Sequence, residues 1–155
     1  MSDDAGDVVE RVTPDGGVVV GDDGSAGARA AILFALEEAG RRATTLHVLR
    51  AWSITSAVRP AGAGSGYIPS LAEFQQGTLD AERERVRQLC GEAHGVNVQV
   101  HVAHSPSAQS LIEASTTCDL VVVGSRGRGG FASLVLGSVA LQCVAHARCP
   151  VTVVR

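Results

Sequence analysis

Two runs of three valines, at positions 18–20 and 121–123, constrain the fold of this chain more than any other feature. Each run is wholly apolar and ends at a glycine, Gly21 in one case and Gly124 in the other. A strand with apolar side chains on both faces must be covered on both sides of its sheet. Such strands are typical of parallel sheets with helices on both faces, so the two runs predict an α/β fold.

Segments with helical periodicity alternate with further strand-like segments along the chain. The predicted strands cover residues 17–21, 44–49, 97–102, 119–123 and 151–154, and the predicted helices cover 25–42, 71–93, 105–116 and 137–146. This alternation predicts a single doubly wound, mainly parallel five-stranded sheet, flanked by about four helices in a Rossmann-like arrangement with right-handed crossovers. Residues 53–70 are rich in Ser, Gly, Pro and Ala, and we expect a long loop there.

Capping residues and charges refine these predicted helices. Ser25 or Asp23 is expected to cap the first helix, and Ser105 is expected to cap the third, with Pro106 at its first position. The second helix carries a run of charged residues that we expect on its exposed side: Glu82, Arg83, Glu84, Arg85 and Arg87.

Charge is unevenly spread along the chain. Residues 1–16 hold five acidic residues and one arginine, which predicts a disordered acidic leader ahead of a domain at 17–155. The rest of the chain has no basic stripe, so we expect no nucleic-acid partner. No apolar segment is long enough to cross a bilayer, and the N-terminus lacks the apolar region of a signal peptide, so we expect a cytoplasmic protein without a membrane partner.

Missing residue types exclude some chemistries. The chain has no lysine, which excludes a Walker-type phosphate loop and a lysine Schiff base. The four cysteines form no C-x-x-C pair, and we expect reduced, mostly buried thiols. His101 and His104 are three residues apart on a predicted strand and should point to opposite faces, so we expect no metal site.

A glycine-rich loop, Gly124–Gly130, follows the predicted fourth strand directly. In a doubly wound sheet, ligands bind beyond the carboxyl ends of the strands, where the strand order reverses. Glycines let backbone N–H groups approach a phosphate, and the predicted helix start at Gly137 and Ser138 adds further N–H groups and a hydroxyl. Arg126 and Arg128 are interpreted either as neutralising phosphate charge or as solvated side chains.

The spacing of this loop carries a family resemblance. Gly124 and Gly127, followed after nine residues by Gly137 and Ser138, match the pattern G-2x-G-9x-G-S/T. With this pattern, residues 17–155 resemble the universal stress protein family in its ATP-binding branch. By motif match, the resemblance implies a nucleotide site at Gly21, Asp23, Val48, Gly124, Ser125, Arg126, Gly127, Arg128, Gly129, Gly130, Gly137, Ser138 and Val139.

The resemblance also implies a function. It implies a regulatory protein of the stress response that binds ATP, with or without Mg²⁺, and forms a homodimer through its last strand, with a protein partner that stays unidentified. No general base stands beside a nucleophile, so we expect no enzyme beyond weak ATP hydrolysis. The motifs H-x-G-H and S-G-G-x-D-S of adenylyl transfer are absent. Two alternatives stay open: a pocket for cyclic AMP, and an interaction protein that binds no nucleotide.

Two positions depart from the family pattern. Asp22 stands where the family usually has an aliphatic residue, and it adds negative charge near a triphosphate unless it points away or binds Mg²⁺. The turn before the third helix reads Ser105-Pro-Ser-Ala108 in place of Gly-x-Pro-Ala, which changes a loop.

Overall fold

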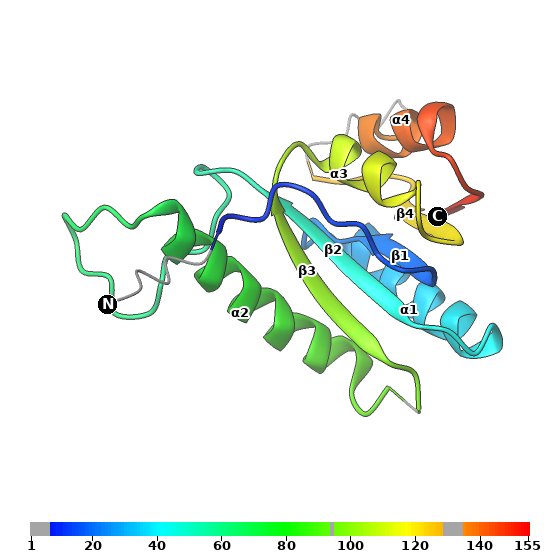
Figure 1. Ribbon diagram of the computed structural model, residues 1–155, viewed down its shortest axis with the longest axis horizontal. Helices are drawn as coiled ribbons and strands as arrows, with labels where there is room; N and C mark the ends of the chain where they lie inside the picture. The colour runs from blue at the N-terminus through cyan, green and yellow to red at the C-terminus, as the bar shows by residue number, and fades with distance from the viewer. Residues whose placement is uncertain (1–6, 94, 129–134) are drawn as a thin grey trace.

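Five parallel strands form one sheet in the order β3-β2-β1-β4-β5 (Figure 1). The structure is a computed structural model that describes residues 7–93, 95–128 and 135–155. The elements are β1 (Val18–Gly21), α1 (Ala26–Arg41), β2 (Leu46–Trp52), α2 (Leu71–Cys90), β3 (Val98–His104), α3 (Ser107–Ala114), β4 (Leu120–Gly124), α4 (Ser138–His146) and β5 (Val151–Val154). The predicted α/β fold, with its parallel sheet and four flanking helices, is confirmed.

Helices cover both faces of the sheet, which explains why the valine runs are apolar throughout. Val18 and Val20 pack on one face against α1 and against Val86 of α2. Val19, between them, points to the other face and packs in a second cluster with residues of α3 and α4. The period-two alternation of strand side chains thus supplies both cores from one apolar run.

Local capping chemistry sets where the helices begin. Ser25 is the N-cap of α1, as predicted, and its Oγ accepts a hydrogen bond of 3.1 Å from the Ala28 N–H. The predicted cap at Ser105 is wrong, because the N-cap of α3 is Pro106 and no side chain caps this helix. Pro106 has an extended ψ of 140°, so the helix starts only at Ser107.

The predicted exposure of the α2 charges is wrong at Glu82, whose relative exposure is only 1%. Glu82 lies on the buried stripe of α2, one helical turn from Thr78 and from Val86. Arg85 is half-buried, whereas Arg83, Glu84 and Arg87 are exposed as predicted. A run of charged residues thus places one of its carboxyl groups inside the protein.

The predicted disorder of the acidic leader is wrong for residues 7–16, which lie against the sheet (Figure 1). The Val9 carbonyl accepts a hydrogen bond of 2.8 Å from the His104 N–H, and the Gly16 N–H donates to the Thr117 carbonyl at 3.0 Å. Val12 is buried in the core cluster of α3 and α4. Apolar residues between the acidic ones therefore anchor this segment; residues 1–6 lie outside the described residues.

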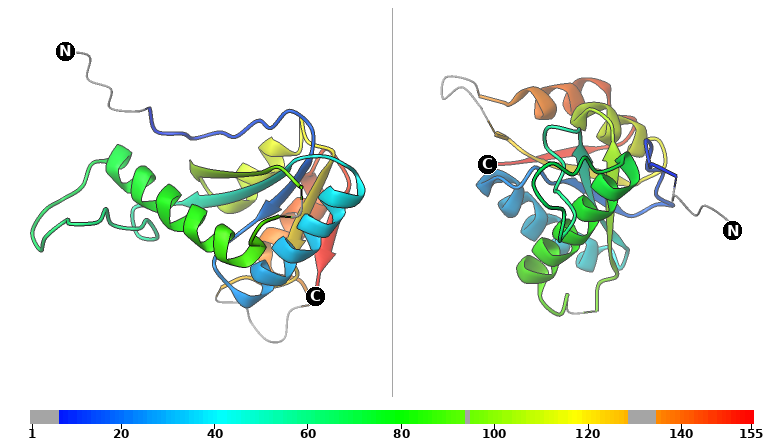
Figure 2. Two further views of the ribbon diagram at one scale, coloured as in Figure 1. Left: turned by 90° about the horizontal axis from the view of Figure 1, so that it is seen from below. Right: turned by 90° about the vertical axis from the view of Figure 1, so that its left-hand side faces the viewer.

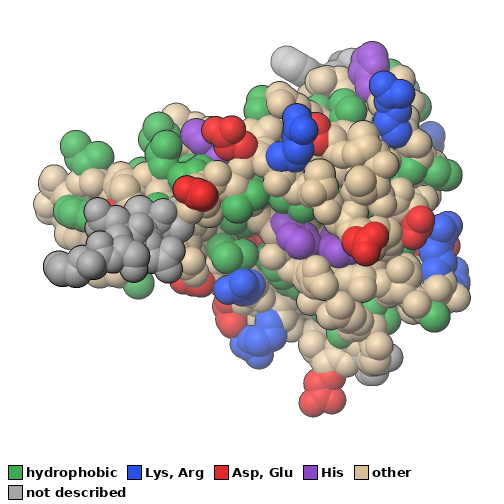
Figure 3. Space-filling view, viewed as in Figure 1, with side chains coloured by type: hydrophobic (Ala, Val, Ile, Leu, Met, Phe, Trp, Pro, Cys, Tyr) green, Lys and Arg blue, Asp and Glu red, His purple; other side chains and the backbone are tan. Residues whose placement is uncertain are grey.

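The predicted loop at 53–70 projects from the domain beside the start of α2 (Figure 2). The loop exposes Ile54, Tyr67 and Ile68, the last with a relative exposure of 87%. Figure 3 shows hydrophobic side chains gathered at this end of the molecule. In the described part of the chain, no helix is both long enough and apolar enough to span a membrane.

Candidate functional site

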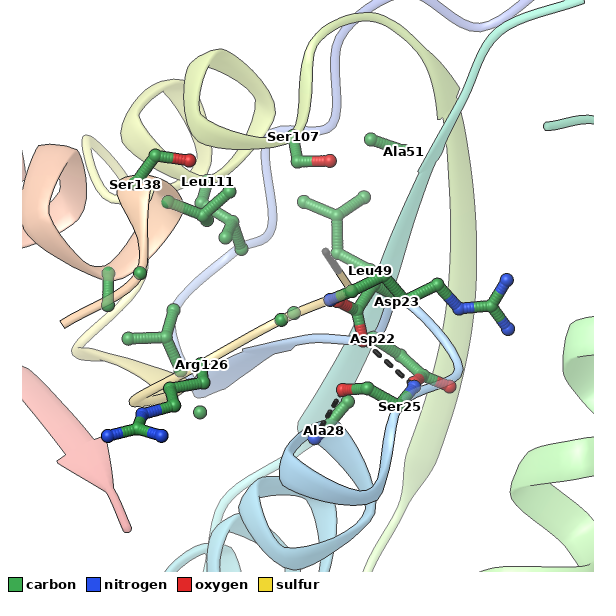
Figure 4. A pocket seen from close by; sticks show the side chains of 18 of the residues that line it. Asp22, Asp23, Ser25, Ala28, Leu49, Ala51, Ser107, Leu111, Arg126 and Ser138 are labelled. Atoms are coloured by element: carbon green, nitrogen blue, oxygen red, sulfur yellow. Dashed lines mark hydrogen bonds between the residues drawn. The ribbon is translucent and has the colours of Figure 1, made fainter. Parts of the chain in front are cut away.

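A cavity of about 430 Å³ opens at the carboxyl ends of the central strands (Figure 4). The strand order reverses between β1 and β4, because β1 continues toward β2 and β4 continues toward β5. The connections after β1 and β4 therefore diverge to opposite faces of the sheet and leave a crevice. The turn after β1, the loop after β4 and the starts of α3 and α4 line this crevice.

The structure brings most of the predicted site residues together. Those that line the cavity are Gly21, Asp23, Gly124, Arg126, Gly127, Arg128, Gly137, Ser138 and Val139. Val48 and Ser125 are not among the lining residues, and Gly129 and Gly130 lie outside the described residues. These residues come from two connections, β1 to α1 and β4 to α4, which are about 100 residues apart in the sequence.

Val48 does not line the cavity, because its side chain faces the opposite side of the sheet. It is fully buried in the core cluster of α1 and α2. Leu49, the next residue on β2, points to the other face and lines the cavity instead. Val48 and Leu49 are adjacent on β2, and a displacement of one residue moves a strand side chain to the other face of the sheet.

Ser125 holds the loop in place through its backbone. Its N–H donates to the Val154 carbonyl of β5 at 2.7 Å, and its carbonyl accepts the Gly137 N–H at 2.6 Å. These two bonds fasten the loop after β4 to the last strand and to the start of α4.

Asp23 joins the two loops that face each other across the cavity. Its Oδ2 accepts the Arg128 N–H at 3.0 Å, and its Oδ1 accepts the Ser25 N–H at 2.9 Å. A Cβ placed on Gly127 would lie 2.6 Å from Asp23 Oδ2, so a side chain at Gly127 would displace the Asp23 carboxylate. The φ angle of Gly127 is not positive, so its backbone conformation does not require glycine. The close approach of the Asp23 carboxylate to its Cα explains why glycine stands there.

Two further glycines let the loop after β4 touch the first turn of α1. A Cβ on Gly27 would lie 2.7 Å from the Arg126 carbonyl oxygen, and a Cβ on Gly124 would lie 3.0 Å from the Gly27 backbone. The backbone of both segments therefore reaches the cavity without intervening side chains.

Asp22, which also lines the cavity, belongs to a buried charge network. Its side chain is fully buried, and the Arg85 Nε donates to its Oδ2 at 2.7 Å. The Gly24 N–H donates to its Oδ1 at 2.8 Å. Burial opposes ionisation of Asp22, but hydrogen bonds from Glu82, Arg85 and the Gly24 N–H hold its pKa below the ordinary value.

Glu82 is the protonated member of this network. Burial and then the neighbouring Asp22 carboxylate raise the pKa of Glu82 to about 8, despite the Arg50 guanidinium beside it. The Arg50 Nη1 lies 3.1 Å from Glu82 Oε2. At neutral pH, Glu82 therefore keeps its proton, and Asp22 carries the negative charge. The network links α2 to the turn that lines the cavity.

Several cavity residues were missed by the sequence reasoning: Leu49, Ala51, Ser107, Ser110 and Leu111. Three of them lie on α3, whose start points to the same sheet edge as the glycine loop, and this topology was a usable signal. The Ser110 Oγ is buried and has no hydrogen-bond partner among the described residues. Burial of a hydroxyl without a hydrogen-bond partner in the protein is costly, so a polar group of a ligand suits it as a partner.

The cavity can bind an anion that carries an apolar group. Helix α4 begins at its wall with Gly137 as N-cap and no side-chain cap, so backbone N–H groups and the positive end of the helix dipole are available there. Leu49, Ala51 and Leu111 supply an apolar wall (Figure 4). Arg126 is exposed and its guanidinium points away from these residues in Figure 4.

The histidines of β2 and β3 (His47, His101 and His104) do not line the cavity. His101 contacts His47, with Nε2 and Nδ1 2.9 Å apart, while His104 stacks on Trp52. Burial and the neighbouring His47 lower the pKa of His101 to about 4. These contacts give the histidines of β2 and β3 structural partners.

The sequence profile of the universal stress protein family matches residues 17–155. The chain belongs to the universal stress protein family. A curated relative, the universal stress protein Rv2624c of Mycobacterium tuberculosis, is 34% identical over an alignment of 141 residues that covers 89% of this chain and 47% of the relative. The chain thus spans about half the length of the curated relatives that it matches.

Solved universal stress proteins share the fold. The protein UspA from Lactobacillus plantarum has a TM-score of 0.70 and 20% identity, covering 93% of this chain and 100% of its own. A universal stress protein in complex with cAMP has a TM-score of 0.62 and 22% identity, covering 90% and 96%. One from Archaeoglobus fulgidus in complex with dAMP has a TM-score of 0.58 and 21% identity, covering 90% and 98%.

Proposed function

We propose that this universal stress protein binds an adenine nucleotide, ATP, in the cavity between the β1–α1 turn and the loop after β4. The observation that carries the proposal is the meeting of both glycine-containing connections and the uncapped start of α4 at one cavity of about 430 Å³. That volume lies within the range of small-molecule sites.

The cavity combines an apolar wall with a polar, backbone-lined wall, as a nucleotide requires. Its apolar wall, with Leu49 and Leu111, suits a base, and the backbone of Gly124 and Gly127 with the α4 start suits phosphates. The orphaned Ser110 hydroxyl lies in the same cavity and offers a polar contact to the ligand. The Asp22 and Asp23 carboxylates both accept hydrogen bonds from the protein, so an accompanying Mg²⁺ would have to share their oxygens with these donors.

Binding of ATP would act as a regulatory signal in the stress response. We propose that the protein does so as a homodimer that pairs through β5, an edge strand of the sheet. Leu141 and Val144 of α4, the helix whose residues contact β5, are more than half exposed and would be covered by a second copy. The cytoplasmic location, the absence of an enzymatic activity and the protein partner remain predictions from the sequence.

Mass spectrometry of the freshly purified, denatured protein tests the ligand class directly. Adenine nucleotide released in proportion to protein supports the proposal. If none is released, and added ATP does not bind at millimolar concentration in calorimetry, the cavity is not a nucleotide site.

Cyclic AMP is the second candidate, because a solved universal stress protein is described in complex with cAMP. The two ligands differ in the phosphate chain, and only ATP extends a triphosphate toward the start of α4. Competition for a fluorescent adenine nucleotide separates them. Displacement of the probe at a lower concentration of ATP than of cyclic AMP supports our proposal. The reverse order would identify cyclic AMP as the ligand.

A further inference from the structure

Two of the four cysteines meet near the amino ends of β4 and β5, away from the nucleotide cavity. Cys118 lies in the turn before β4, and Cys149 lies in the connection between α4 and β5. Their Sγ atoms are 3.8 Å apart. We propose that this pair is a site of covalent modification, at which hydrogen peroxide or a small organic hydroperoxide joins the two sulfurs in a disulfide bond.

The backbone around the pair is held so that the sulfurs stay close. The Arg148 N–H donates to the Ser115 Oγ at 2.9 Å, and the Pro150 carbonyl accepts the Val121 N–H at 3.0 Å. Both residues that flank Cys149 are thus fastened to the elements that flank Cys118. Closing the sulfurs from 3.8 Å to the ~2.05 Å of a disulfide takes about 1.8 Å, shared between two side chains.

The reaction consumes one peroxide and releases two waters, or one alcohol and one water when the oxidant is an organic hydroperoxide. The Cys149 thiolate attacks the O–O bond, forms a sulfenic acid, and the displaced oxygen leaves as water (or as an alcohol from an organic hydroperoxide). The Cys118 sulfur then attacks the sulfenic sulfur, the S–S bond forms, and the hydroxyl leaves as water with the Cys118 proton. Both sulfurs are oxidised, and the peroxide is the only oxidant required.

Exposure sets the order of the two steps. Cys149 is partly exposed, whereas Cys118 is buried. Burial, together with the neighbouring Cys149, raises the pKa of Cys118 to about 12. Cys118 is therefore a poor first nucleophile, and Cys149 meets the peroxide first. Once Cys149 is a neutral sulfenic acid, its charge no longer opposes ionisation of Cys118.

A disulfide here would fasten the start of β5 to the start of β4. It closes a loop between positions 118 and 149, and closure of a loop of this size should raise the midpoint of thermal unfolding by roughly 5–10 °C. The nucleotide cavity lies at the other end of the strands, so ATP binding should not change. The inference therefore stands or falls separately from the proposed nucleotide function.

Peptide mapping of the full chain tests the pair. The reduced protein is treated with hydrogen peroxide, alkylated under denaturing conditions, and cut after arginine and glutamate, which places each of the four cysteines in a separate peptide. We expect the peptides 114–126 and 149–155 joined, with a mass two hydrogen atoms below their sum. Cys149→Ser should abolish the joined peptide and the thermal shift, whereas Cys90→Ser should keep both.

Cys149→Ser changes a partly exposed side chain, so it is the variant expected to stay folded; Cys118→Ser repeats the test at the buried position. The proposal is overturned if Cys118 remains fully alkylated after Cys149 is oxidised. It is also overturned if the disulfide that forms contains Cys90 or Cys143, or joins two chains.

Discussion

The backbone N–H of Arg128 donates a hydrogen bond of 3.0 Å to the Oδ2 of Asp23, which joins two loops that are 105 residues apart in the sequence. The other oxygen of the same carboxylate holds the Ser25 N–H at the start of α1. Burial opposes ionisation of Asp23, but hydrogen bonds from Ser25 and the Arg128 N–H keep its pKa below the ordinary value. Asp23 therefore stays an ionised acceptor at neutral pH and fixes the width of the cavity.

Asp23→Ala should weaken ATP binding, because the loop after β4 loses its anchor to the β1–α1 turn. Loss of a charge-assisted hydrogen bond costs roughly 1.5–3 kcal/mol, which corresponds to about 10- to 150-fold in affinity. Calorimetric titration with ATP measures the change. Asp80→Ala, at an exposed acid of α2, is the matched control and should bind like the parent. Equal affinity for both variants would show that the bridge does not shape the site.

Stability should fall as the pH rises from about 5 to 9, because Glu82 is protonated in the folded protein. Its pKa is about 8 when folded and 4.5 in the reference state, so folding retains a proton that the unfolded chain releases. The stabilisation is complete below pH 4.5 and is lost as the pH rises through 8. Each pH unit in this interval lowers the free energy of unfolding by up to about 1.4 kcal/mol. The low pKa of Asp22 acts only in a lower pH range, where acid removes its contribution.

Glu82→Gln keeps a neutral side chain of the same shape and should flatten this dependence. Thermal unfolding measured across the pH range tests it, with the exposed Glu84→Gln as control. A Glu82→Gln profile with the same slope as the parent would mean that another group carries the proton.

Asp22→Val should destabilise the protein, because it leaves the Arg85 guanidinium without its fully buried partner. Removal of one member of a buried ion pair costs about 3–5 kcal/mol. From the sequence alone, Asp22 adds negative charge near a triphosphate unless it points away or binds Mg²⁺, and removal of a charge that does neither would tighten ATP binding. Because the carboxylate is paired with Arg85, we expect no such gain. Denaturant unfolding, together with ATP titration of any folded fraction, tests both points, and Asp22→Val with Arg85→Met should recover part of the lost stability.

The homodimer predicts a mass of two chains in light scattering at micromolar concentration. The ladder to β4 uses the Pro150 and Val154 carbonyls, so the alternate residues of β5, Val151 and Val153, direct their N–H groups away from β4. Val153→Pro removes one outward donor without breaking that ladder, and it should give a monomer. A parent that is already a monomer would contradict the dimer.

The alternation of strand-like and helical segments, with glycines at the ends of two strands, was sufficient to predict the fold. The valine runs indicated strands that are covered by helices on both faces of the sheet. Gly21 and Gly124 marked the carboxyl ends of two strands that are adjacent in the structure. The position of residues 7–16 was not predictable from charge, because the apolar Val12 and backbone pairing outweigh the acidic side chains there. The burial of Glu82 was not predictable for a related reason. A run of charged residues on a helix predicts an exposed face unless the buried partners of one of them, here Asp22 and Arg50, are known.

The candidate site was predictable where backbone spacing defines it and not where side-chain direction decides. The pattern from Gly124 to Ser138 picks out a loop and a helix start that line the same cavity. The sequence predicted Val48 in the pocket, whereas its neighbour Leu49 lines the cavity. Strand boundaries inferred from sequence do not determine which face of the sheet a residue occupies. Ser110 was missed because its significance lies in a hydroxyl without a partner, which only the folded structure reveals.

Calorimetric titration of ATP into the parent and two glycine variants tests the central claim most directly. A Cβ on Gly127 would lie 2.6 Å from Asp23 Oδ2, whereas a Cβ on Gly64 meets nothing within 4 Å, so Gly64→Val controls for the substitution itself. We predict that the parent and Gly64→Val bind ATP equally and that Gly127→Val, with an unchanged circular dichroism spectrum, binds at least about tenfold more weakly. Folded Gly127→Val that binds ATP as tightly as the parent would contradict the assignment of this loop to the phosphates.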